Sequence, residues 1–247
     1  KLNLIPKPPQ TKGLLCVHLE NLSDAFKANL IALKHEPGAV ELMDDKVLEQ
    51  TKHNISQRKN RFFIQGDPEA ILIIEWARNT KKEIEEIAQK TIEELANSNL
   101  GYHFPMVFGD DIPRVWNLRK AGLGVLNNMP GDAKPVAVIE DTSVHPEKLP
   151  DYMDDFQKML DEMKLSCVYY AHIATGELHL RPVLNLKNER HVELFHEVAE
   201  RTAKLVKKYK GSLSGEHGDG RLRGEFIPVM LGKENYQFLK SLKYTWD

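Results

Sequence analysis

The chain has 247 residues, a formal net charge of −2, 41% hydrophobic residues and 28% charged residues. This balance is ordinary for a globular protein, and the nearly neutral charge gives no electrostatic footprint for nucleic acid or an anionic membrane. The longest apolar run, residues 70–77, is too short to span a bilayer and the first residues lack the apolar core of a signal peptide, so we expect a cytoplasmic protein without a transmembrane segment.

Residues 1–13 are rich in proline and lysine and are expected to form a linker. After it, apolar runs bounded by turn residues alternate with apolar residues at helical spacing. Helices are expected to follow Ser23, Thr80, Pro146 and Asn188, where a capping residue or a proline precedes the periodic segment. Strands are expected at residues 14–19, 39–43, 70–76, 135–140, 165–172 and 178–184.

This alternation indicates an α+β protein built from ferredoxin-like repeats. We expect a largely antiparallel sheet with helices packed on one face. Since no second linker is visible, residues 14–247 are expected to form one domain. The polar segment 45–59 stays ambiguous, and Gly211 is expected to end the last long helix.

The two cysteines, Cys16 and Cys167, lie in apolar runs typical of strands and have no C-x-x-C spacing. We expect both to be buried reduced thiols. A cysteine-ligated iron–sulfur or zinc site within this chain is thereby excluded.

Two histidines flank a predicted hairpin turn. Pairing His172 with His179 would place both imidazoles on one face of the sheet, with Tyr170 opposite Arg181. Two metal ligands suit this arrangement, and two surface histidines beside a turn are the alternative.

A glycine-rich stretch follows the last long helix. Residues 211–226 contain five glycines, a composition typical of a flexible loop or of backbone held close to another group. Within it, Glu216 and His217 offer a carboxylate ligand and a base. The spacing is not that of a dinucleotide-binding fingerprint. Arg119 and Lys134 are cations that lie earlier in the sequence. They would contribute to a functional site if they faced the same cleft as the histidines, and the alternative is that they are solvated surface charges.

The stretch SLSGEHGDGRLRGEF, residues 212–226, together with the H-x6-H hairpin, resembles the carboxy-terminal domain of the FAD-linked oxidases of the vanillyl-alcohol oxidase superfamily. Within that superfamily the nearest group contains glycolate oxidase large subunits, D-lactate dehydrogenases and D-2-hydroxyglutarate dehydrogenases. The resemblance extends to the segments AVELM at 39–43 and AVIEDTSV at 137–144.

The resemblance implies a role for each matching position. His172, His179 and Glu216 match ligands of a divalent metal, for which zinc, manganese or iron is suitable. His217 matches the catalytic base. Arg119 and Lys134 match residues that hold the substrate carboxylate, and Arg181 matches a position that faces the substrate.

The implied function is the substrate- and metal-binding part of an FAD-dependent enzyme that oxidises a 2-hydroxy acid, such as glycolate or D-lactate, to the 2-oxo acid. Nothing in the chain resembles the amino-terminal FAD-binding domain of the family, so the isolated chain is expected neither to retain FAD nor to turn over. The family also implies an iron–sulfur acceptor domain or subunit as a partner.

The hairpin departs from the usual family pattern, because Ala171, Ala174, Thr175, Glu177 and Arg181 replace other residues. An additional arginine would favour a more anionic substrate, unless Glu177 pairs with it. A stand-alone ferredoxin-like module that binds a metal or a small anion without redox activity is the alternative function.

Overall fold

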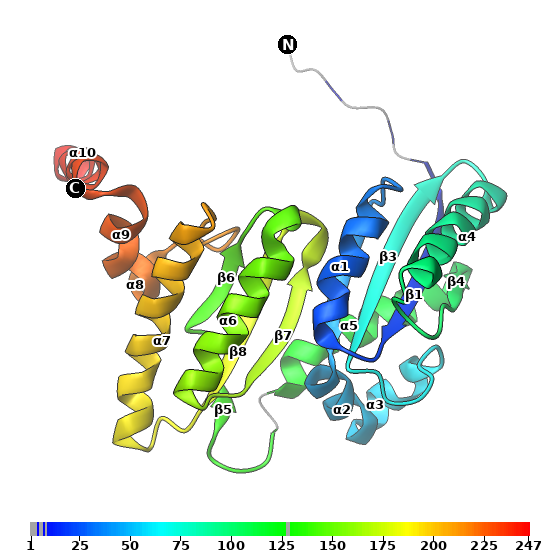
Figure 1. Ribbon diagram of the computed structural model, residues 1–247, viewed down its shortest axis with the longest axis horizontal. Helices are drawn as coiled ribbons and strands as arrows, with labels where there is room; N and C mark the ends of the chain where they lie inside the picture. Colours follow the sequence, from blue (N-terminus) through cyan, green and yellow to red (C-terminus); the bar gives the residue numbers. More distant parts are fainter. Residues whose placement is uncertain (1–3, 5–6, 8, 127–128) are drawn as a thin grey trace. The chain divides into compact units, whose positions relative to one another are not determined.

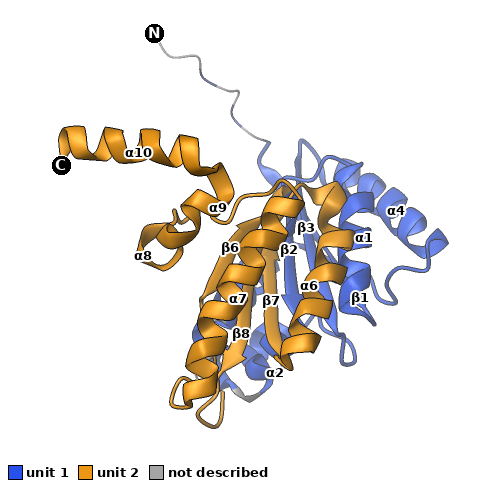
Figure 2. Ribbon diagram, turned by 60° about the vertical axis from the view of Figure 1, so that its left-hand side comes forward, with its two compact units in different colours: residues 1–125, 172–174 blue, residues 126–171, 175–247 orange. Residues whose placement is uncertain are grey.

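The computed structural model describes residues 4, 7, 9–126 and 129–247. Residue contacts divide the chain into two compact units, residues 1–125 with 172–174 and residues 126–171 with 175–247 (Figure 2). The division between the units lies inside the segment 14–247, which was predicted as one domain. The first strand begins at Thr11, inside the predicted linker, and residues 1–3, 5–6 and 8 of that linker lie outside the described residues.

The first unit has the β-α-β-β-α-β order of a ferredoxin-like fold (Figure 1). Its strands lie in the order β4-β1-β3-β2, and each neighbouring pair is antiparallel. The predicted α+β class and antiparallel sheet are therefore confirmed. The elements are β1 (Thr11–Leu19), α1 (Leu22–Leu33), β2 (Ala39–Asp44), α2 (Asp45–His53), α3 (Ile55–Arg58), a 3₁₀ turn (Lys59–Arg61), β3 (Ala70–Arg78), α4 (Lys81–Asn97), β4 (Met106–Phe108), a second 3₁₀ turn (Gly109–Asp111) and α5 (Ile112–Leu126).

Helices cover both faces of the sheet in the first unit. Gly13 pairs with Trp76, and a Cβ on Gly13 would lie 2.8 Å from Ile84 of α4, so this face packs on α4. The opposite face carries Glu75, which accepts a hydrogen bond from Trp116 of α5 at 3.2 Å. Burial on both faces explains why β1 and β3 are continuous apolar runs without alternation.

The second unit repeats the same order with one strand reduced to a single bridge. Strand β8 pairs antiparallel with β6 and β5 and also neighbours β7. Ser212 then bridges Ser143 at the end of β6, where the first unit has its fourth strand. The predicted ferredoxin-like repeats are thus present. The elements are β5 (Lys134–Pro135), β6 (Ile139–Ser143), a 3₁₀ turn (Pro146–Lys148), α6 (Leu149–Met163), β7 (Cys167–His172), a 3₁₀ turn (Ile173–Thr175), β8 (Glu177–Leu184), α7 (Glu189–Lys208), α8 (Gly220–Arg223), a 3₁₀ turn (Gly224–Phe226), α9 (Ile227–Leu231) and α10 (Lys233–Trp246).

The helix starts match the predicted caps at two of the positions. The Thr80 hydroxyl accepts from the Glu83 amide at 3.2 Å, and the Asn188 side chain accepts from the Arg190 amide at 2.9 Å. The prediction for Ser23 was wrong, because α1 begins at Leu22 and Ser23 lies inside its first turn. The ambiguous segment 45–59 is mostly helical.

Gly211 follows the end of α7, as predicted, and its amide donates to the Val206 carbonyl of the last turn at 2.9 Å. The left-handed residue after α7 is Lys210, with φ of 58°. Gly211 also packs so closely against the Ser143 carbonyl that a Cβ would collide with it. The bridge between Ser143 and Ser212 therefore depends on this glycine. Both cysteines are buried free thiols, as predicted, and burial raises the pKa of the Cys16 thiol.

Candidate functional site

The hairpin of β7 and β8 is present, but its register differs from the predicted one. Two neighbouring strands joined by so short a turn must run antiparallel. The Val183 amide donates to the Ser166 carbonyl at 2.8 Å, and the Tyr170 ring stacks on His179 with centroids 4.7 Å apart. The predicted pairing is thus displaced by two residues. A shift of two keeps every side chain on its predicted face, because the side-chain period of a strand is two.

Polar side chains of the second unit gather on the sheet face that points away from α6. Tyr169 marks the face toward α6, since its hydroxyl donates to Gln157 at 2.7 Å and its ring contacts Phe156. Tyr170, the next residue, therefore faces the other way with its stacking partner His179. In a protein interior, polar groups on such a face need partners.

Glu140 supplies several of these partners. Its carboxylate accepts from Arg181 at 2.6 Å and from the Tyr170 hydroxyl at 2.8 Å, and Arg181 Nε donates to that hydroxyl at 2.9 Å. Burial and the neighbouring Glu140 raise the pKa of Tyr170, so its hydroxyl stays a donor. Because Glu140 balances the charge of Arg181, this arginine adds no net positive charge for a more anionic substrate. The predicted alternative partner, Glu177, does not have this role.

Asp141 forms a bulge in β6 and holds the loop that carries Glu216 and His217. The pairing with β8 shifts between Glu140 and Thr142, and Asp141 takes a φ of 87°. Its fully buried carboxylate accepts from the amides of Glu216 at 2.7 Å and His217 at 3.1 Å, and also from the Ser214 hydroxyl. Burial alone would raise the pKa of Asp141, but hydrogen bonds from the Glu177 carboxyl group, the Ser214 hydroxyl and the two amides together lower it below its ordinary value.

Arg223 and Gly215 complete the support of this loop. The Arg223 guanidinium donates to the carbonyl oxygens of Glu140 and Gly218, both at 2.6 Å, and lies 3.3 Å from the Asp141 carboxylate. Gly215 packs against the carboxylate of Glu177, and a Cβ there would collide with it. The glycine-rich stretch is therefore backbone held close to other groups. One short helix, α8, begins within the stretch at Gly220.

Two of the predicted metal ligands lie together in this unit. His179 Nε2 is 3.8 Å from Glu216 Oε1, and His217 Nε2 is 3.2 Å from the same oxygen. Two ligand atoms of one tetrahedral zinc ion are separated by about 3.4 Å, given bond lengths of about 2.1 Å. The pair of His179 and Glu216 therefore fits a shared cation.

A second grouping of Asp141, Glu216 and His217 also has ligand atoms within 4.8 Å of one another. It suits a metal less well, because the Asp141 carboxylate already accepts from amides, a hydroxyl and a guanidinium. In the Glu140–Arg181 and Asp141–Arg223 ion pairs, the negative charge of the carboxylate is balanced by the positive charge of the guanidinium. The carboxylate of Glu216 lies beside the imidazoles of His179 and His217, and a carboxylate with imidazoles is a donor set that binds divalent cations.

Two further predicted residues meet in the first unit. His172, the last residue of β7, has its Nδ1 atom 2.8 Å from Glu41 Oε1. Arg119 of α5 lies 3.0 Å from the other oxygen of the same carboxylate. A predicted metal ligand and a predicted substrate cation thus share Glu41.

Lys134 does not join the cluster around His179. It pairs with Leu184, whereas Glu140 pairs with His179 five residues earlier on β8. At about 3.4 Å per residue these positions are about 17 Å apart along the strand. The Lys134 ammonium donates to the Met129 carbonyl. Its substrate role stays a prediction.

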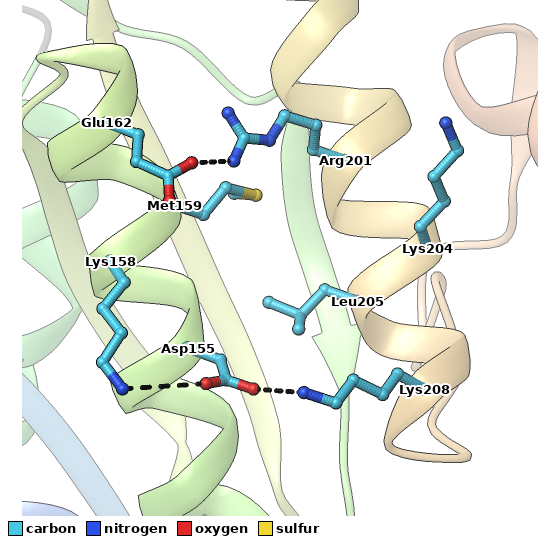
Figure 3. A pocket seen from close by; sticks show the side chains of 8 residues that line it. All are labelled: Asp155, Lys158, Met159, Glu162, Arg201, Lys204, Leu205 and Lys208. Atoms are coloured by element: carbon cyan, nitrogen blue, oxygen red, sulfur yellow. Dashed lines mark hydrogen bonds and ion pairs between the residues drawn. The ribbon is translucent and has the colours of Figure 1, made fainter.

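A charged groove lies between α6 and α7 (Figure 3). It has a volume of about 460 Å³ and eight lining residues, and none of them is a predicted site residue. Asp155 faces Lys158 and Lys208 across 3.9 and 2.6 Å, and Glu162 pairs with Arg201. The Asp155–Lys208 and Glu162–Arg201 pairs join the two helices, so the groove is best explained by helix packing.

Sequence reasoning missed the acidic residues that hold the predicted ones, namely Glu41, Glu140 and Asp141. The available signal was that these carboxylates interrupt otherwise apolar strands, at positions where a charge is seldom buried without a partner.

None of the helices in the described part of the chain has the length and apolarity needed to cross a bilayer.

This fold and this loop belong to a known class of flavoprotein domain. The family model for FAD linked oxidases, C-terminal domain, matches residues 8–247, and the chain belongs to this family. The D-2-hydroxyglutarate dehydrogenase of Pseudomonas putida is 32% identical over 255 residues, which cover 100% of this chain and 25% of that protein. The glycolate oxidase subunit GlcD of Bacillus subtilis is 23% identical and is covered to 50%. The chain thus spans between a quarter and a half of the length of these relatives.

Solved structures share the fold at much lower sequence identity. p-Cresol methylhydroxylase aligns over 98% of this chain and 52% of its own with a TM-score of 0.65 and 13% identity. The 4-ethylphenol oxidase of Gulosibacter chungangensis aligns over 100% of this chain and 53% of its own with a TM-score of 0.63 and 12% identity. At this identity the likeness concerns the fold alone.

Proposed function

We propose that this chain is the substrate- and metal-binding part of an FAD-dependent enzyme that oxidises a 2-hydroxy acid to the 2-oxo acid. The observation that carries the proposal is the placement of the His179 and His217 imidazoles around one oxygen of the Glu216 carboxylate, at 3.8 and 3.2 Å from Oε1. Membership of the FAD linked oxidase family supports it. So do relatives whose names specify D-2-hydroxyglutarate dehydrogenase, D-lactate dehydrogenase and glycolate oxidase.

Within this function, His179 and Glu216 are proposed to hold a divalent cation, with His172 as the third ligand on the strength of the sequence pattern. Two imidazoles and one carboxylate suit zinc, manganese or iron. The 3.8 Å separation of His179 Nε2 and Glu216 Oε1 supports this assignment.

His217 is proposed to be the general base. It follows Glu216 directly, its ring lies parallel to that of His179 at 5.8 Å, and its amide is held by Asp141 at 3.1 Å. Oxidation of a 2-hydroxy acid requires that the hydroxyl proton leaves as the C2 hydride departs. Histidine is the side chain that most often accepts a proton in general base catalysis. When bound, FAD would take up the hydride and the cation would polarise the hydroxyl.

On the strength of the sequence pattern, Arg119 and Lys134 are proposed to hold the substrate carboxylate, and Arg181 is proposed to face the substrate. Guanidinium groups match carboxylates in bidentate geometry. The present contacts of Arg119 and Arg181 with Glu41 and Glu140 mean that substrate would have to share or displace an internal carboxylate.

We assign no residue of this chain to FAD and propose that another domain of the parent protein holds it. The identity of the 2-hydroxy acid is not specified by these residues. An iron–sulfur acceptor and a cytoplasmic location stay predictions from the sequence.

Metal binding by the 247-residue chain tests the proposal. Equilibrium dialysis against Zn²⁺ or Mn²⁺, followed by elemental analysis, should give about one equivalent for the wild type. We expect binding at least roughly ten-fold weaker in His179→Ala and Glu216→Ala. His196→Ala is the matched control, because His196 also lies against a carboxylate, Glu225 at 3.1 Å, in the same unit.

A 2-hydroxy acid provides the second arm of the test. D-lactate should strengthen metal retention, whereas propionate, which lacks the hydroxyl, should not. Equal metal content in the wild type and both ligand variants would refute the ligand assignment. No metal in the wild type even with D-lactate would refute the proposed function.

A further inference from the structure

Glu41 contacts two predicted site residues at once, and both contacts lie within the first unit. His172 Nδ1 is 2.8 Å from Oε1 and 3.0 Å from Oε2 of Glu41. An Arg119 guanidinium nitrogen donates to Oε2 at 3.0 Å. The Glu41 and Arg119 side chains are only 13% and 11% exposed, whereas the His172 side chain is 43% exposed. The carboxylate is therefore held in place, and the imidazole reaches solvent.

The sheet explains why Glu41 is well placed for this contact. Glu41 pairs with Ile73 in the register of β2 and β3, so it lies on the same sheet face as Glu75. Trp116 and Arg119, three residues apart on α5, contact Glu75 and Glu41 respectively. Two carboxylates on one sheet face thus meet one face of one helix.

The contact determines which nitrogen of His172 carries the proton. An ionised carboxylate can only accept hydrogen bonds, so the Nδ1 atom must donate. In the neutral ring the lone pair then lies on Nε2. In this tautomer Nε2 is the nitrogen that can ligate a metal. Carboxylates that accept from the second ring nitrogen of a ligating histidine also make it a better donor to the metal.

We propose that Glu41 is a positioning residue that holds His172 in its Nδ1–H form, with Nε2 directed to a divalent cation. This inference rests on the proposed function, because it takes His172 as a metal ligand. It adds a residue that contacts the cation only through His172. Within the first unit, Glu41 thus contacts both a proposed metal ligand, His172, and a proposed carboxylate-binding residue, Arg119.

The first measurement is the tautomer of His172 in the metal-free chain. Two-dimensional ¹⁵N NMR of the imidazole nitrogens distinguishes the Nδ1–H and Nε2–H forms, and His172→Gln identifies the His172 signal. We expect the Nδ1–H form in the wild type. Glu41→Leu should shift His172 to the Nε2–H form. Glu41→Gln should keep Nδ1–H, because its amide oxygen still accepts.

The second measurement is affinity for Co²⁺, followed by visible absorption, which reports the ligands of the ion. Affinity should fall by about 10- to 100-fold in Glu41→Leu. The loss of Co²⁺ affinity should be smaller in Glu41→Gln. Glu75→Leu is the matched control, since Glu75 lies on the same face, is 14% exposed and likewise accepts from a cation and a ring nitrogen, those of Lys12 and Trp116. It should leave both the tautomer and the affinity unchanged.

The outcomes separate the inference from the proposed function. An Nε2–H or mixed tautomer in the wild type would overturn the inference. The inference would also be overturned if the wild type and Glu41→Leu bound Co²⁺ with equal affinity while His172→Gln bound it weakly. If the wild type binds no metal, the proposed function fails and the positioning role fails with it. If Glu41→Leu does not fold, Glu41→Gln carries the test through its intermediate loss of affinity.

Discussion

Arg181 and Glu140 form a largely buried ion pair, with 2.6 Å between nitrogen and oxygen and side chains 13% and 10% exposed. The Tyr170 hydroxyl bridges them, since it accepts from the guanidinium and donates to the carboxylate. The arginine that the sequence pattern assigns to the substrate therefore already has a counter-charge in the protein. This makes Arg181 a residue on which the local structure depends, whatever it does for a substrate.

Removing Glu140 should destabilise the chain strongly. Glu140→Leu leaves the charge of Arg181 buried without its partner, which costs about 3–5 kcal/mol in the free energy of unfolding. The double variant Glu140→Leu/Arg181→Met should recover part of this loss, because neither charge is then buried. Urea denaturation of the three proteins measures both effects. As a control, Glu193→Leu breaks the exposed pair with Arg190 and should cost less than about 1 kcal/mol. A double variant no more stable than Glu140→Leu would contradict the explanation.

Asp141 should control the order of the loop that carries Glu216 and His217. Asp141→Asn replaces one acceptor oxygen by a donor, which must face a backbone amide or Arg223. We expect the amide protons of Glu216 and His217 to exchange with solvent at least roughly ten-fold faster, the equivalent of about 1.4 kcal/mol. Hydrogen exchange followed by mass spectrometry measures this. Asp132→Asn, at the exposed pair with Lys187, should leave exchange in this loop unchanged. Unchanged exchange in Asp141→Asn would show that the loop is ordered by other contacts.

Gly215 should tolerate a methyl group only if Glu177 is shortened. The Cβ of an alanine at position 215 would collide with the Glu177 carboxylate, and such overpacking typically costs about 1–3 kcal/mol. Gly215→Ala should therefore lower the unfolding free energy by this amount. The cost should shrink when the same change is made in a Glu177→Ala background. Thermal or urea unfolding of the four proteins of this cycle gives the coupling directly, and additive effects would argue against the contact.

The chain should be purified without bound flavin. No residue of this chain is assigned to FAD, and the chain spans only 25% to 50% of the length of the relatives described above. The expected result is a colourless protein whose absorption spectrum lacks the flavin bands, even after incubation with excess FAD and gel filtration. A yellow protein with stoichiometric FAD would refute the proposal that another domain holds the cofactor.

The sequence predicts the elements where a local pattern dominates. Thr80 with Glu83 and Asn188 with Arg190 are caps that need only neighbouring residues. The Glu216–His217 pair was found because its motif is contiguous. The Asp141 bulge could not be predicted, since one extra residue in one strand becomes visible only when the partner strand is known.

Contacts between distant residues limit what could be predicted for the site. Glu41 and His172 are 131 residues apart, and nothing in either local pattern indicates that they meet. The predicted hairpin register differs from the observed one by two residues. The turn contains a 3₁₀ segment, Ile173–Thr175, which the predicted pairing of His172 with His179 did not take into account. The correct face was nevertheless predicted, because a shift of two preserves it.

His18 should make the stability of the chain depend on pH. Its ring is fully buried, the Gln65 amide donates to its Nε2 atom at 3.3 Å, and its Nδ1 atom lies 3.1 Å from the Cys16 carbonyl. These contacts suit a neutral ring with its proton on Nδ1. Burial lowers the pKa of His18 from 6.5 to about 4.

A histidine whose pKa is lower in the folded than in the unfolded state contributes its full stability above the unfolded pKa of 6.5, and this stability is lost as the pH falls toward about 4. The difference corresponds to about 3 kcal/mol at the acid end. Urea unfolding between pH 7.5 and 4 should show a shallower pH dependence for His18→Gln than for the wild type, by about this amount. His103→Gln is measured in parallel, because the His103 ring lies 4.9 Å from that of His18. It should retain most of the wild-type slope, and equal slopes in all three proteins would show that His18 does not titrate in this range.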